Sequence, residues 1–114
     1  MNGEGLQMTP EKYEKILEGW SSEERKAAEA AKRAGDERRH SICLMKASMM
    51  GDMLKVLGKV EMSGRRGTLE RLAAQCEAEA EKLRAREDFD AAERSMIKAE
   101  TIRRARKLID GEEA

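Results

Sequence analysis

The chain has little of what sheets, tight turns and catalytic sites are built from. Its 114 residues include one Pro, one His, two Cys and one each of Trp, Tyr and Phe. Ala, Glu, Lys, Arg, Leu and Met dominate instead, and charged residues make up 40% of the chain. That composition is typical of amphipathic helices with ion-paired outer faces. It predicts an all-α protein, and 114 residues suffice for one domain.

The chain also lacks an excess of charge of either sign, because its 23 basic and 23 acidic side chains cancel. Without a net field, any binding to nucleic acid or to an anionic membrane would need a local patch. The most apolar run, Ile42 to Met62, is interrupted by charged residues, among them Lys46, Asp52, Lys55 and Lys59, so it is not expected to cross a bilayer. The segment MNGEGLQM does not resemble a signal peptide, and the two cysteines, Cys43 and Cys76, lie in apolar helical contexts. We therefore expect a cytoplasmic protein with two buried free thiols.

The run from Ile42 to Met62 is expected to form the central helix of the fold. At helical spacing it carries two adjacent apolar stripes, which cover about half of its circumference. One stripe is Ile42, Met45, Met49, Met53, Val56 and Val60, and the other is Leu44, Ala47, Met50, Leu54 and Leu57. One neighbouring helix cannot cover so wide a face, so at least two partner helices, from this chain or from a second copy, are expected.

Helix start and stop signals divide the first half of the chain. Thr9 is a candidate N-cap with Pro10 at the first helical position, which predicts a short N-terminal helix. Its apolar face would consist of Tyr13, Ile16, Leu17 and Trp20. Ser21 followed by Glu24 is typical of a capping box, which predicts that a second helix begins there and runs through Ala34. Gly35 and Asp36 then predict a tight reversal into the central helix.

The second half begins after the clearest break, Ser63 to Gly67, which has two glycines in five residues. Thr68 is the expected cap of the next helix, and Asp90 the expected cap of the last one, which should end near Asp110. We therefore predict a helical bundle of two antiparallel helical hairpins plus a short N-terminal helix. The expected domain is residues 9–110 with halves 9–62 and 68–110, a flexible N-terminus at 1–8 and a tail at 111–114.

The two halves show a weak internal repeat when they are offset by 52 residues. Ala28-Glu29, Asp36 and Lys46-Ala47 then fall on Ala80-Glu81, Asp88 and Lys98-Ala99, and the two predicted turns align. Gly35-Asp36 in the first half, and Glu87-Asp88-Phe89 with Ala92, Met96 and Ala99 in the second, are similar to the turn and second helix of a tetratricopeptide-like hairpin. The resemblance covers about 15 residues per half. The resemblance implies stacked antiparallel hairpins. The chain departs from that family in its long second helices and in lacking the aromatic signature of the first helix.

Few residues are candidates for a metal site or a catalytic site. Glu37, His40 and Cys43 have the helical spacing of metal ligands, and a homodimer could supply the second copy that a dinuclear site needs. A His beside two arginines near a helix start is more often a surface or capping residue, and a Cys on a core stripe behaves as a small apolar side chain. No phosphate-cradling loop is present, since Gly64 to Gly67 lacks the Lys-Ser/Thr pair. No enzyme activity, metal or cofactor is therefore expected.

Basic side chains gather in the central loop and on the last helix, where an antiparallel hairpin could bring them into one patch. This patch would consist of Arg65, Arg66, Arg103, Arg104, Arg106 and Lys107. Phosphate binding, and hence nucleic acid, is one use of such a patch. The alternative is that these basic side chains form surface ion pairs with nearby glutamates. No aromatic residue accompanies the basic run to stack on bases.

The remaining peculiarity is methionine, which occurs eight times in the chain. Flexible thioethers fill irregular cores and also recur on surfaces that accept partner helices. The leading hypothesis is a non-catalytic protein–protein interaction module, a small bacterial or phage adaptor, regulator or inhibitor, expected as a homodimer. The predicted partner-binding residues are Met45, Met49, Met53, Val56, Val60 and Trp20. Nucleic-acid binding and a metal-binding bundle are the alternatives.

Overall fold

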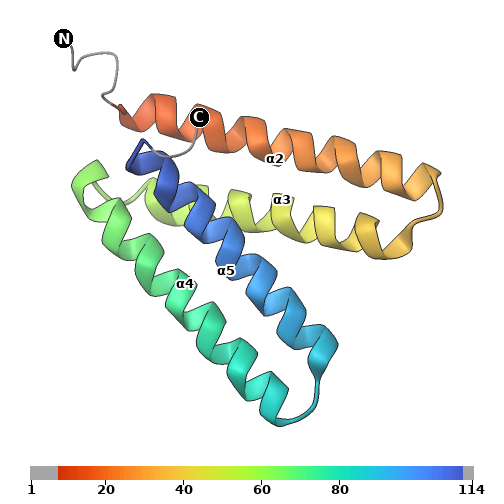
Figure 1. Ribbon diagram of the computed structural model, residues 1–114. Helices are drawn as coiled ribbons and strands as arrows, with labels where there is room; N and C mark the ends of the chain where they lie inside the picture. Colours follow the sequence, from red (N-terminus) through yellow and green to blue (C-terminus); the bar gives the residue numbers. More distant parts are fainter. Residues whose placement is uncertain (1–7, 112–114) are drawn as a thin grey trace.

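The structure, a computed structural model, describes residues 8–111 and contains four α-helices in that range (Figure 1). They are α2 (Pro10–Arg33), α3 (Glu37–Leu57), α4 (Met62–Ala85) and α5 (Phe89–Ile109). No strand occurs among residues 8–111, so the expectation of an all-α fold is confirmed there. The predicted flexible N-terminus and tail fall, apart from Met8 and Gly111, outside the described residues.

Neighbouring helices pair in antiparallel fashion, α2 with α3 and α4 with α5 (Figure 1). The two pairs meet near the connection between Leu57 and Met62 and diverge away from it, so that the ribbon has the outline of a V. The inner helices α3 and α5 pack against each other, while α2 and α4 lie on the outside.

Helix α2 begins as predicted but does not stop where predicted. The Lys12 backbone N–H donates to Thr9 Oγ1 at 3.1 Å, and Pro10 takes the first helical position. The separate short N-terminal helix is wrong, because α2 runs unbroken through Ser21. Ser21 is buried, and its hydroxyl donates to the Ala47 carbonyl oxygen at 3.2 Å instead of capping a helix.

Helix α3 starts at the predicted cap, since the Arg39 N–H donates to Asp36 Oδ1 at 3.1 Å. Its end was predicted too late. The helix stops at Leu57, Gly58 is its C-cap, and Val60 lies in the short connection that follows. Met62 opens the next helix instead of closing this one.

The predicted break at residues 63–67 is wrong, because α4 is helical through both of its glycines. Thr68 is not a cap, and its hydroxyl donates to the Gly64 carbonyl oxygen at 3.1 Å within the helix. The last helix is capped by Asp88, which accepts from the Ala91 N–H at 3.4 Å, and not by Asp90. The boundary between the two halves of the fold is therefore the connection from Gly58 to Glu61.

The 52-residue offset of the sequence recurs in the helix bounds. Helices α2 and α4 both have 24 residues, α3 and α5 both have 21, and each second member starts 52 positions later. The two turns match as well, since Gly35 has φ 78° and its counterpart Glu87 has φ 62°. Glycine adopts this left-handed conformation without cost, whereas Glu87 does so at some strain. Buried positions also recur, as in Leu17 and Leu69, Ala28 and Ala80, Ala47 and Ala99, Met50 and Ile102, and Met53 and Ala105.

The core lies where the four helices converge. Leu17, Leu57 and Leu69 are fully buried there with Met50 and Met53. Tyr13 joins α2 to α5, because its hydroxyl donates to the Ala105 carbonyl oxygen at 2.7 Å. Burial raises the pKa of Tyr13, and the nearby Arg65 charge offsets this only in part, so the phenol remains a donor at neutral pH.

Candidate partner-binding groove

An apolar hollow of 220 Å³ opens between α3 and α4. We call this hollow the groove. Helix α3 forms one wall, α4 forms the other, and the buried Ile102 of α5 contributes to its base. The residues that line it are Met49, Asp52, Met53, Val56, Leu72, Gln75, Cys76 and Ile102. It therefore combines side chains from both halves of the chain.

The predicted partner-binding residues divide between this groove and the core. Met49 is partly buried and Val56 is 42% exposed, and both line the groove. Met53 also lines it but is only 1% exposed, and Trp20 is 7% exposed in the core. Met53 and Trp20 are therefore enclosed by the chain itself and present almost no surface to a partner.

The two other predicted residues, Met45 and Val60, are partly buried and do not line the groove. Sequence reasoning missed the opposite wall, Leu72 with Gln75 and Cys76. Their helical spacing was visible, but which helix they face depends on how the two halves pack.

The groove is apolar apart from two side chains, Asp52 and Gln75. Asp52 is exposed and is the one charged residue among the described residues that line the groove. Burial raises the pKa of the Cys76 thiol, and nearby Lys98 opposes this only in part. The thiol is thus protonated at neutral pH and behaves as an apolar lining group. Cys76 is only partly buried, which corrects the expectation of two buried free thiols.

The predicted basic patch is largely neutralised. Arg65 is wrongly placed in it, because its side chain is buried and bonded to Glu14 Oε2 at 2.8 Å. Arg66 and Arg106 share the carboxylates of Glu70 and Asp110, with the closest contact, Arg106 Nη1 to Glu70 Oε1, at 3.1 Å. Arg103 pairs with Glu77, and Arg104 stacks over the Trp20 ring at 3.7 Å from its centroid, whereas Lys107 is exposed.

The suggested metal ligands do not form a metal site. Across residues 8–111, no group of three or more His, Cys, Asp or Glu side chains is placed to hold a metal ion. His40 uses Nδ1 to donate to the Ala28 carbonyl oxygen at 2.9 Å, which joins α3 to α2. Burial and then Glu24 raise the pKa of the Cys43 thiol, so this cysteine is not activated as a nucleophile. A 480 Å³ hollow beside it is lined mainly by side chains of both charges.

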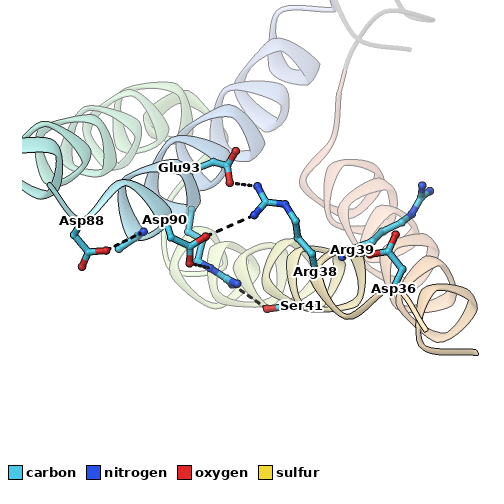
Figure 2. Close-up of polar contacts among 9 residues, drawn as sticks. Asp36, Arg38, Arg39, Ser41, Asp88, Asp90 and Glu93 are labelled. Atoms are coloured by element: carbon cyan, nitrogen blue, oxygen red, sulfur yellow. Dashed lines mark hydrogen bonds and ion pairs between the residues drawn. The ribbon is translucent and has the colours of Figure 1, made fainter. Parts of the chain in front are cut away.

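Polar contacts join the N-terminal ends of α3 and α5 (Figure 2). Arg38 pairs with Glu93 and lies 3.6 Å from Asp90, while Arg94 Nη1 donates to Ser41 Oγ at 2.9 Å. Each exposed pair contributes little on its own. Together they bridge the two inner helices away from the Leu57–Met62 connection.

Comparison of the chain with protein-family models, curated proteins and solved structures gave no match. None of the helices within residues 8–111 combines the length and hydropathy that a membrane crossing requires.

Proposed function

We propose that the protein is a non-catalytic helical interaction module of the adaptor, regulator or inhibitor kind, and that its groove receives apolar side chains of a protein partner. The observation that carries this proposal is the groove itself. Met49, Val56, Leu72 and Cys76 form an apolar lining from two separate halves of the chain, and it is open to solvent. Sites that take up apolar groups of a ligand commonly have such a lining, mostly apolar with few polar side chains.

The chemistry of the lining suits a bound side chain. Covering apolar area stabilises a complex by about 25 cal/mol per Å² before the costs of association are subtracted. Met49 can adjust its unbranched side chain to the shape that binds. Helix-in-groove recognition works in this way, with anchors that enter a hollow between helices.

Nucleic-acid binding has less support as a function. Of the six predicted contacts, Arg65 is buried and three others are paired with carboxylates, so few cations remain for phosphates. Replacing these carboxylates by phosphate would give up existing ion pairs for new ones. The proposal therefore rests on the groove.

Photo-cross-linking tests the groove with a matched control on the same helix. Val56 is 42% exposed and lines the groove, whereas Leu44 is 44% exposed and does not. A benzophenone side chain is placed at either position in the full chain, and adducts are identified in the source cell by mass spectrometry. We expect a specific protein adduct from position 56 and none above background from position 44.

Glutamate substitutions at the same two positions, one in the groove and one outside it, complete this test. Val56→Glu should abolish capture of the protein identified from position 56, and Leu44→Glu should leave it intact, because only Val56 lines the groove. Both sites are exposed, so circular dichroism should show the same helix content. Equal adducts from both positions, or none from either, would show that the groove is not an interaction site.

A further inference from the structure

The 52-residue offset gives the groove a counterpart elsewhere in the molecule. Moving each lining residue by 52 positions leads to a second set of side chains on α2, α3 and α5. Leu72 corresponds to Trp20, Asp52 to Arg104, Met49 to Thr101, Val56 to Leu108 and Ile102 to Met50. Because the helix bounds and several buried positions repeat at the same offset, the two sets lie at equivalent positions along corresponding helices.

The counterpart site is filled by the chain itself. The Trp20 ring is packed into the core with only 7% exposed, and the Arg104 guanidinium lies over its face at 3.7 Å from the centroid. The hollow left there is 150 Å³ and is bordered by Glu24, Lys46 and Glu100. An aromatic ring under a cation is thus what closes this kind of site.

The groove lacks both parts of that arrangement. Leu72 replaces the indole with a smaller side chain, and Asp52 replaces the guanidinium with a short one of opposite charge. What remains is the 220 Å³ apolar hollow with a single carboxylate. Its space suits a ring, and its charge suits a cation beside that ring.

We propose that the groove binds an aromatic side chain accompanied by a cation, both supplied by a separate protein partner. The ring enters between Leu72 and Ile102, and a neighbouring Lys or Arg of the partner pairs with Asp52. This inference rests on the proposed function, because it names the chemistry of the partner that occupies the same groove. On a partner helix the two residues would lie three or four positions apart, where side chains share a face.

A second copy of the chain is the competing occupant. Phe89 is 62% exposed, and Arg86 lies three positions before it at the turn between α4 and α5. Self-association that rises with concentration and disappears in Phe89→Ala, measured by native mass spectrometry, would overturn the assignment to a separate protein. A wild-type chain that stays monomeric supports it.

Three indole probes that differ in charge test the chemistry directly. Tryptamine carries a cation, indole is neutral and indole-3-acetate carries an anion. Methyl NMR of the full chain follows the signals of Val56, Leu72 and Ile102 as each probe is added. Tryptamine should shift these signals at a concentration at least threefold lower than indole does, and indole-3-acetate should need the highest concentration of the three. In Asp52→Asn, tryptamine and indole should become equivalent, whereas Glu29→Gln on the exposed face of α2 should change nothing. Equal responses to the three probes in the wild-type chain would overturn the inference.

A variant that copies the filled site into the groove provides an independent test. Leu72→Trp combined with Asp52→Arg should close the groove, so that tryptamine no longer shifts the Val56 and Ile102 methyls and the cross-link from position 56 is lost. The single change Asp52→Arg leaves the hollow empty. It should weaken the binding of tryptamine, while indole should still bind. Retention of tryptamine binding by a folded double variant would contradict the proposal. Cross-linking from position 56 without any preference for the cationic probe would overturn this inference and leave the proposed function standing.

Discussion

Replacing Arg65 with alanine is expected to lower the free energy of unfolding by about 3 kcal/mol, one of the largest effects of any single change to this chain. The side chain is 3% exposed and holds the start of α4 in place through three groups. Its guanidinium bonds Glu14, its Nε donates to the Val60 carbonyl oxygen at 3.1 Å, and it lies 5.7 Å from the centroid of the Tyr13 ring. Alanine would leave a cavity and remove the partner of Glu14. Denaturation by urea, followed by circular dichroism, measures the loss.

Methionine at the same position separates packing from charge. Arg65 Nη1 is buried without a hydrogen-bond partner, which is itself unfavourable, and methionine would remove this group while filling most of the space. Arg65→Met should therefore cost about 1 kcal/mol, well below the alanine variant. Arg71→Ala, at an exposed site on the same helix, is the control and should change little. Equal losses for Arg65→Ala and Arg71→Ala would show that Arg65 does not hold the fold together.

Local signals in the sequence predicted the all-α class, and the caps at Thr9 and Asp36 were also correct. They failed where long-range packing outweighed them. Ser21 has the sequence pattern of a helix cap, but its buried hydroxyl donates a hydrogen bond to the Ala47 carbonyl oxygen, 26 positions away. Gly64 and Gly67 are both helical in α4, although glycine is an unfavourable helix residue. Arg65 anchors this part of α4 to Glu14, 51 positions earlier in the chain. No local pattern contains such contacts.

The candidate site was predicted in part for the same reason. Met49 and Val56 follow from the periodicity of the central helix, and both line the groove. Leu72 and Cys76 belong to an equally regular stripe, but nothing in that stripe says which helix lies opposite. The 52-residue repeat was visible in the sequence, yet its meaning for the site required the structure. Only there does Trp20 fill one site while its counterpart Leu72 leaves the other open.

Glutamate substitutions at two neighbouring methionines are expected to give opposite outcomes, although the sequence places both on one stripe. Met53 is 1% exposed, so Met53→Glu would bury a carboxylate among apolar side chains and should cost at least about 4 kcal/mol at neutral pH. Met49 is only partly buried at the edge of the groove, so Met49→Glu should keep its charge in water. It should cost about 1 kcal/mol and abolish the cross-link from position 56.

The pH dependence of Met53→Glu follows from the burial of the new carboxyl group. Burial would raise its pKa in the folded chain above the value of about 4.3 that an unfolded chain gives it. Below that pH both states are protonated and the loss is smallest, whereas between the two pKa values only the unfolded state ionises, so stability falls as pH rises. Urea denaturation at pH 4 and pH 7, referenced to the wild-type chain, should show this fall for Met53→Glu and almost none for Met49→Glu. A similar pH dependence in both variants would mean that Met49 is enclosed by the chain itself, and the groove would then be part of the core.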